Sequence, residues 1–183
     1  MGPAKAENLI TRPGDHNQYK FELEPQLVIR PGGPGWARYY CDDPNYPPPP
    51  ARPCDDYWGP GGGAGIGPGI RVNIPFMHNG PVTSINNNIG ISFGGSLTFH
   101  GNAGYGATVL NLPVAFQWNF YFTQVVSVLG EVGLNTPVAF WAEGSRFTIE
   151  PLLQAGGRFQ WGKVGIIARL GWPLFSVGAN FQF

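Results

Sequence analysis

The stretch Leu110–Phe122 reads LNLPVAFQWNFYF, and it decides the fold because its apolar residues fall on every second position. The even positions carry leucine, valine, phenylalanine and tryptophan, whereas the odd positions include Asn111, Gln117 and Asn119. Side chains alternate between the two faces of a β-strand, so this spacing predicts a strand with one apolar and one polar face. An α-helix would scatter the two sets around its axis.

The same alternation recurs in seven further runs on either side of this one. These runs are residues 19–30, 66–76, 85–99, 126–134, 148–161, 164–172 and 175–183. Most of them are longer than the usual globular strand of about five or six residues. No helix candidate of convincing length lies between the runs, and no stretch approaches the roughly 18 apolar residues that a membrane-spanning helix needs. We therefore expect an all-β fold of eight strands.

Alternation alone fits two architectures, a soluble barrel or sandwich with an apolar core and a membrane barrel with an apolar exterior. An eight-stranded barrel has an interior just wide enough for side chains, too narrow for the many bulky groups of the apolar face. Residues 72–130 also contain no Asp, Glu, Lys or Arg, whereas a soluble sheet normally carries charges toward water. The sequence therefore predicts an antiparallel up-and-down transmembrane β-barrel with a polar, side-chain-filled lumen.

The charges of the strands fall on the polar face, which the barrel turns inward. The chain carries 11 Lys+Arg and 11 Asp+Glu, a balance that argues against nucleic-acid binding. An unpaired buried charge costs several kcal/mol, so we predict a paired network in the lumen. Its members are Glu22, Glu24, Arg71, Glu131, Glu150, Arg158 and Arg169, with Lys20 and Arg30 on the same face. We expect Arg158 and Glu150 to pair across strands, with Glu131, Arg169 and Arg71 as candidate partners.

The barrel also predicts how the chain is divided. Residues 1–18 are expected to form an N-terminal periplasmic tail, and residues 19–183 a single barrel domain. Residues 31–63, a Pro- and Gly-rich segment, are its predicted long extracellular loop. Further outer loops are expected at 100–107 and 136–146, with shorter turns near 77–84, 123–125 and 162–163 on the periplasmic side. No secretory signal is visible, so we expect a mature form from which the signal peptide has been removed.

The end of the chain carries the most specific motif. Phe175, Val177, Phe181 and Phe183 alternate along the last strand, so that an apolar series ends in a terminal aromatic residue. This pattern resembles the C-terminal insertion signal that the barrel-insertion machinery reads. The first strand and residues 64–183 together resemble the small eight-stranded outer-membrane barrels of the OmpA and OmpX type. The resemblance implies a place in the bacterial outer membrane, contact with its lipid, and the insertion machinery as a partner during biogenesis.

A second, more local similarity concerns two short phrases. ELEP at residues 22–25 and AGGRF at residues 155–159 are similar to segments of uncharacterised outer-membrane proteins of myxobacteria. That similarity implies no activity.

Two cysteines lie in the Pro-rich segment. Cys41 and Cys54 each begin the tripeptide Cys-Asp-Asp in polar surroundings, which suits a disulfide of an exported protein. A bridge would close a loop of about fourteen residues and contribute about 3 kcal/mol by the chain-entropy model. Two interpretations stay open: the bridge only constrains the loop, or it also gathers four acids into a candidate calcium site, because hard cations take clustered oxygen ligands. These acids are Asp42, Asp43, Asp55 and Asp56. We predict no resident metal or cofactor.

We predict a monomeric, non-enzymatic outer-membrane barrel with a structural or surface-recognition role through its disulfide-closed first loop. Two alternatives stay open. A lipid-modifying outer-membrane enzyme would use a histidine near one rim, and His100 shares a face with Ser96. A narrow small-solute pore is the other alternative, which inward-pointing side chains such as Arg158 and Glu131 would obstruct.

Overall fold

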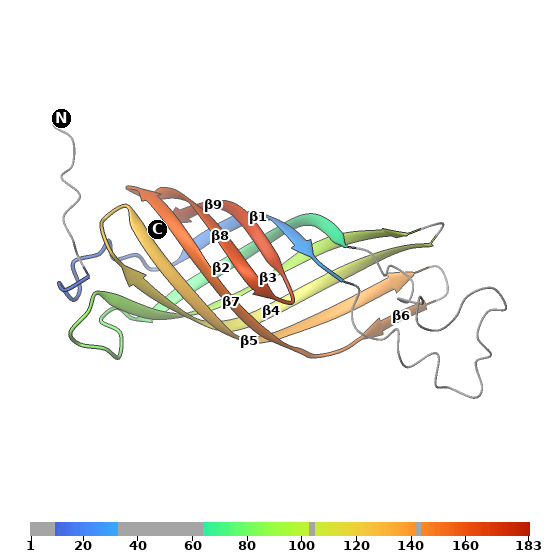
Figure 1. The fold of residues 1–183 in the computed structure, drawn as a ribbon, viewed down its shortest axis with the longest axis horizontal. Helices are drawn as coiled ribbons and strands as arrows, with labels where there is room; N and C mark the ends of the chain where they lie inside the picture. The colour runs from blue at the N-terminus through green and yellow to red at the C-terminus, as the bar shows by residue number, and fades with distance from the viewer. Residues whose placement is uncertain (1–9, 33–63, 103–104, 142–143) are drawn as a thin grey trace.

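The computed structural model describes residues 10–32, 64–102, 105–141 and 144–183. They form one antiparallel sheet that closes on itself, and Figure 1 shows an elongated barrel whose strands are tilted against its long axis. The strands are β1 (Glu22–Arg30), β2 (Gly65–Met77), β3 (Asn87–Asn102), β4 (Tyr105–Tyr121), β5 (Val126–Trp141), β6 (Gly144–Phe147), β7 (Glu150–Trp161), β8 (Val164–Trp172) and β9 (Phe175–Gln182). Among the described residues, no helix is long and apolar enough to cross a membrane.

The barrel closes where its first and last strands meet. β1 pairs antiparallel with β9 from Glu22↔Gln182 to Ile29↔Phe175, and we call this pairing the seam. The remaining neighbours follow the order of the chain, with β4 paired to β5. β6 and β7 both pair with β5 and are separated by two residues, so they act as one interrupted wall strand. The predicted closed barrel of eight antiparallel strands is therefore confirmed.

The two ends of the barrel differ in their connections. β1 begins and β9 ends at the same end, where residues 78–86, 122–125 and 162–163 connect neighbouring strands. In outer-membrane barrels such turns face the periplasm, so we call this the periplasmic end and the opposite one the outer end.

The wall is uneven in height at the outer end. β3, β4 and β5 have 16, 17 and 16 residues, whereas β8 and β9 have nine and eight. The hairpins β3–β4 and β5–β6 therefore project beyond the rest of the rim (Figure 1). The loops expected at 100–107 and 136–146 are largely strand, so those bounds were wrong. The alternation of apolar residues is lost near Gly101 and Pro137, but the backbone ladder continues, because it needs no particular side chain.

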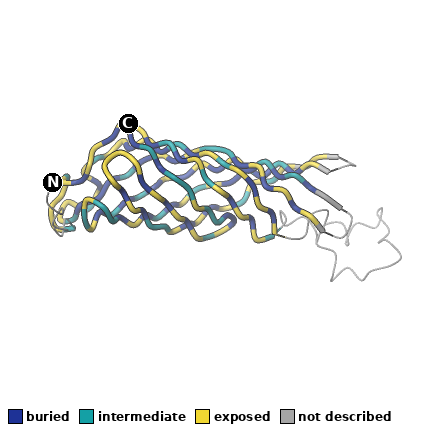
Figure 2. The backbone as a smooth tube through the Cα atoms, turned by 90° about the horizontal axis from the view of Figure 1, so that it is seen from above, coloured by how far each residue is buried: buried dark blue, intermediate teal, exposed yellow. Residues whose placement is uncertain are grey.

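The apolar face of the strands is outside. Leu153 is 65% exposed, whereas its neighbour Leu152 is 1% exposed. Figure 2 shows the same alternation of exposed and buried residues along the whole wall. Large apolar side chains that face outward include Ile70, Phe93, Val114, Phe116, Val132, Leu134, Phe159 and Ile166. Buried positions are instead rich in Asn, Gln, Ser, Arg and Glu, which is the arrangement of a membrane barrel and the reverse of a soluble one.

The alternation breaks at the start of β1. The sequence pattern predicts Tyr19 on the apolar exterior and Lys20 in the lumen, but Tyr19 is buried and Lys20 is exposed. The chain bends at Lys20, and the paired strand begins only at Glu22, so the period of two does not extend back to these residues. The prediction for both residues was therefore wrong, and the interior loses one expected positive charge.

Close approach explains the small residues of the interior face. A Cβ on Gly67 would lie 1.8 Å from the carbonyl oxygen of Leu97, and one on Gly178 would lie 2.2 Å from that of Pro25. Both distances are far below van der Waals contact, so these positions accept only glycine without a shift of the neighbouring strand.

Candidate functional site

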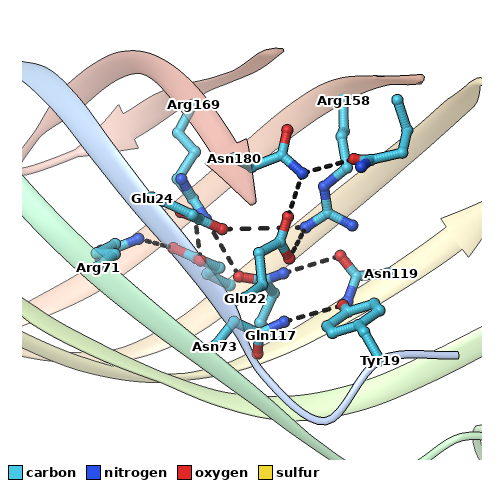
Figure 3. Close-up of polar contacts among 12 residues, drawn as sticks. Tyr19, Glu22, Glu24, Arg71, Asn73, Gln117, Asn119, Arg158, Arg169 and Asn180 are labelled. Atoms are coloured by element: carbon cyan, nitrogen blue, oxygen red, sulfur yellow. Dashed lines mark hydrogen bonds and ion pairs between the residues drawn. The ribbon is translucent and has the colours of Figure 1, made fainter. Parts of the chain in front are cut away.

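Glu22 and Arg158 meet in the barrel interior toward the periplasmic end (Figure 3). Arg158 Nη2 on β7 donates to Glu22 Oε2 on β1 over 2.7 Å. Asn180 Nδ2 on β9 donates to the other oxygen of the same carboxylate over 2.6 Å. Arg158 Nη2 also lies 4.0 Å from Glu24 Oε1. One guanidinium therefore joins two acids of β1.

Arg169 and Glu131 extend these contacts to the other walls. Arg169 Nη2 lies 2.6 Å from Glu24 Oε2, and its Nε donates to Glu131 Oε1 over 3.0 Å. Arg71 Nη1 donates to Glu131 Oε2 over 2.5 Å, and Gln117 Oε1 accepts from Arg169 Nη2 over 3.2 Å. Charged side chains from β1, β2, β5, β7 and β8, with Gln117 of β4, thus form what we call the central network. Its charged members are Glu22, Glu24, Arg71, Glu131, Arg158 and Arg169.

The central network is electrically balanced. Its three carboxylates and three guanidiniums are each at most 2% exposed. Removing one partner of such a pair typically costs about 3–5 kcal/mol, because the other charge stays buried without compensation. The six side chains therefore stabilise the barrel only as a complete set.

A second ion pair lies at the outer end. Arg30 Nη1 and Nη2 donate to the two carboxylate oxygens of Glu150 over 2.7 and 2.9 Å, a bidentate geometry. Asn111 Oδ1 accepts from Arg30 Nη1 over 2.9 Å, and Asn135 Nδ2 donates to Glu150 over 2.8 Å. Glu150 is 12% exposed, so this outer pair sits at the limit of the filled interior.

Amides and tyrosines fill the interior at the periplasmic end. Asn119 Nδ2 donates to Asn88 Oδ1 over 2.7 Å, and Asn88 Nδ2 donates to the hydroxyl of Tyr121 over 2.8 Å. Asn73 Nδ2 donates to the hydroxyl of Tyr19 over 3.2 Å. Neutral groups that donate and accept at once can saturate a buried site without adding charge. The interior thus continues as a hydrogen-bonded layer below the central network.

The connection between β8 and β9 turns into the outer opening. Leu174 is buried there, and its carbonyl accepts a hydrogen bond from Gln154 Nε2. A small cavity beside it offers about 10 Å³ for the centres of water molecules and is lined by Gln26, Ser96, Gln154 and Arg71. That is room for about one water molecule. The cavity is a packing space and does not reach the size of a ligand pocket.

The structure brings most of the predicted lumen residues together, but not with the predicted partners. Arg158 pairs with Glu22, and Glu150 pairs with Arg30, so the partners Glu131, Arg169 and Arg71 were wrong for both. The partners face each other across the lumen, and that distance depends on the tilt and closure of the whole wall. With Lys20 outside, the charges described in the interior are four acids and four arginines.

Other predicted sites fall differently. Cys41, Cys54 and the acids Asp42, Asp43, Asp55 and Asp56 lie outside the described residues. Phe175, Val177, Phe181 and Phe183 lie on or directly after β9, with Val177 and Phe183 exposed on the apolar exterior. Within the described residues, no group of three or more His, Cys, Asp or Glu is placed to hold a metal ion.

The interior also contains His100 and Ser96, which the sequence singled out, and two amides that it did not. His100 and Ser96 share a face as expected, and that face is the interior: both are buried, and Thr98 Oγ1 lies 3.1 Å from His100 Nε2. Asn111 and Asn135, the amide partners of the outer pair, follow the period-two pattern on the inner face and were recognisable only as polar positions. Their specific contacts depend on which strands meet.

The closed eight-stranded wall, the apolar exterior and the balanced polar interior define a small integral β-barrel of the bacterial outer membrane. A solved structure with the same fold is that of Ail, the attachment invasion locus protein of Yersinia pestis, in complex with the heparin analogue sucrose octasulfate. The two chains share 13% sequence identity at a TM-score of 0.50, over 89% of this chain and 96% of that one.

A second crystal structure of Ail gives 14% identity and a TM-score of 0.45 over the same shares of the chains. No family model matches the chain, and no curated protein matches it by sequence.

Proposed function

We propose that this protein is a monomeric, non-enzymatic outer-membrane barrel that acts at the cell surface by attachment to an external molecule. The filled interior supports this proposal most. The central network, the outer pair and Leu174 occupy the space that a passing solute would need. An external ligand then meets the outer end, where the hairpins β3–β4 and β5–β6 project and where residues 33–63 connect β1 to β2.

The likeness to Ail adds a ligand class to test. That protein is described as an attachment invasion locus protein and was crystallised with a heparin analogue. Sulfated glycans are therefore the first candidates for the outer end of this barrel.

Adhesion of bacteria that display the full chain tests the proposal. Cells are applied to surfaces coated with heparin, with an uncharged polysaccharide, or with extracellular-matrix protein. The matched variant replaces residues 33–63 by a short Gly-Ser linker, and its heat-modifiable migration on a gel in detergent shows that the barrel still closes. Adhesion that the variant loses supports the proposal. Equal adhesion of wild type, variant and cells without the protein on every surface contradicts it.

A lipid-modifying enzyme and a narrow pore are the rival functions. Against the enzyme, His100 and Ser96 face the interior, where a lipid substrate does not reach them. We expect the lipid A of cells with and without the protein to have the same mass spectrum. Against the pore, we expect sugar-loaded vesicles to leak no faster with the barrel than without it. A new lipid A species or rapid leakage would replace the attachment role.

We further propose that Cys41 and Cys54 are bonded in the exported protein and close the first loop. Thiol labelling of the unreduced, denatured chain is then expected to give almost no signal, and two labelled thiols contradict the bridge. Asp42, Asp43, Asp55 and Asp56 remain the candidate cation site of that loop. Calorimetric titration with calcium, before and after reduction, tests it, because the acids are brought together only by an intact bridge.

We also propose a role for each end of the chain. Residues 1–18 are a periplasmic tail to a single barrel domain of residues 19–183. Phe175, Val177, Phe181 and Phe183 form the insertion signal. Deleting Phe183 is expected to reduce assembly in cells while refolding in detergent stays efficient. Equal loss in both settings would assign Phe183 to barrel stability alone.

A further inference from the structure

Residues 10–20 cross the periplasmic opening of the barrel, and we call them the strap. At the seam, the backbone N–H of Lys20 donates to the carbonyl of Phe183 over 2.7 Å. In the middle of the strap, Gln124 Nε2 in the β4–β5 connection donates to the carbonyl of Asp15 over 2.8 Å. Around the wall, β1 to β4 separate these attachments on one path, and β9, β8, β7 and β5 on the other. The strap therefore joins opposite sides of the opening.

His16 anchors the strap to the wall. Its ring stacks on Tyr121, with centroids 4.1 Å apart and planes 2° from parallel. Its Nδ1 lies 2.6 Å from Asn86 Oδ1, and the backbone N–H of Asn86 donates to the carbonyl of Ile10 over 2.7 Å. His16 is 5% exposed. A titratable ring is thus one of the buried contacts between the strap and the β3–β4 side of the barrel.

The hydrogen bond fixes where the proton of the neutral ring sits. Asn86 Oδ1 only accepts, so Nδ1 donates and Nε2 carries the lone pair. Nε2 is buried, and none of the described residues offers it a hydrogen-bond partner. Protonation would create a buried N–H donor and a positive charge at that atom. Both changes are unfavourable in an enclosed site without an acceptor.

The charged and titratable groups around His16 do not favour a positive charge on its ring. Arg158 of β7 and Tyr121 of β4 line the same small cavity as His16. The charge of His78, in the β2–β3 connection, acts against protonation. From β9, the cavity is lined by the neutral Gln182. The acid nearest in sequence is Asp15, whose side chain is exposed.

We propose that the strap is a pH-sensitive closure of the periplasmic opening, seated while His16 is neutral and released when His16 is protonated. Burial lowers the pKa of His16 below its ordinary value of 6.5, the hydrogen bond with Asn86 opposes this, and His78 adds to it. Because the pKa of His16 is lowered in the seated state, His16 contributes its full stabilisation of the seated strap only above about pH 6.5. As the pH falls below that value, the ratio of seated to released strap drops by up to about tenfold per pH unit.

Nuclear magnetic resonance of the full chain in detergent micelles tests the proposal. The backbone amides of residues 11, 12 and 14–19 and of Asn86 are followed from about pH 7.5 to about pH 5, which spans the ordinary titration of histidine. We expect an ordered strap at neutral pH and a mobile one in acid, with a midpoint below 6.5. A strap that stays ordered throughout this range overturns the proposal.

Three variants separate His16 from a general effect of acid. His16→Phe keeps the stacking on Tyr121 but cannot be protonated, so its strap should stay seated in acid. Asn86→Asp places a carboxylate beside Nδ1, which stabilises the protonated ring and should likewise abolish the acid release. His78→Gln is the control and should retain the release. If the strap of the His16→Phe variant is mobile at every pH, the Asn86→Asp variant alone tests the proposal. Release of Asn86→Asp with the wild-type midpoint overturns the proposal.

Discussion

Arg158 Nη2 on β7 lies 2.7 Å from Glu22 Oε2 on β1, across the interior of the barrel and 136 residues apart in the chain. The side chains are 1% and 0% exposed, so neither charge can turn to water. The contact joins strands that are not neighbours in the wall and that meet only in the closed barrel.

Replacing Arg158 by leucine is therefore expected to destabilise the barrel by about 3–5 kcal/mol, because Glu22 loses its partner but stays buried. Urea unfolding in detergent micelles or lipid vesicles measures the loss. The double variant Arg158→Leu with Glu22→Leu should recover most of it, since no unpaired charge remains. A stability that hardly changes in the single variant would mean that water reaches this face.

Glu131→Gln and Glu150→Gln compare the two ion clusters. Glu131 is fully buried and accepts from Arg71 and Arg169, so its neutralisation should cost about 3 kcal/mol or more. Glu150 is 12% exposed and one of its partners is the neutral Asn135, so the expected cost is about 1–2 kcal/mol. The same unfolding assay measures both. Equal costs would contradict the ranking by burial.

The outward orientation of Leu153 predicts its response to charge and to quenchers. Leu153→Arg should cost about 2–4 kcal/mol if the residue lies near the middle of the bilayer. A spin label at Leu153, which is 65% exposed, should be reached by lipid-soluble oxygen and shielded from a water-soluble quencher. A label at exposed Lys163 in the β7–β8 turn is the control and should show the opposite pattern. Quenching of both labels from water would place the apolar face outside the lipid.

Two glycines test how tightly the wall is packed. Gly178→Ala would put a Cβ 2.2 Å from the Pro25 carbonyl at the seam, whereas nothing lies within 4 Å of a Cβ on Gly157. We expect Gly178→Ala to cost about 1–3 kcal/mol through strain. Gly157→Ala should stay within about 0.5 kcal/mol of wild type. Unfolding midpoints measure both, and a neutral Gly178→Ala would show that the seam can widen.

Local patterns predict the fold well, because the alternation of apolar and polar residues such as Leu153 and Gln154 is imposed by each strand alone. The pattern does not reveal where pairing starts or stops. Tyr19 continues the apolar series but sits beyond a bend, and the Gly-rich ends of β3 and β4 remain paired although their apolar series has ended. Both errors arise where backbone hydrogen bonds, and not apolar side chains, determine the structure.

The contacts between side chains in the interior are harder to predict from the sequence than the strands are. The pattern indicates which residues face inward, and the lumen charges Glu22, Glu131 and Arg169 do so. It does not give partners, since Arg158 meets Glu22 only after tilt and closure bring their strands to one level. His16 gave no signal beyond its residue type, because its place on Tyr121 follows from the path of the strap.

The position of the charges on β1 has a consequence for assembly. Glu22, Glu24 and Arg30 pair with side chains of β7 and β8, and in the described interior none of them pairs with the adjacent β2. A nascent sheet that still lacks β7 and β8 leaves these three charges without their partners. The first strand to be synthesised is neutralised only by some of the last. The charge pattern therefore favours the closed barrel, in which β1 meets β7 and β8 across the interior, over a sheet that lacks these strands.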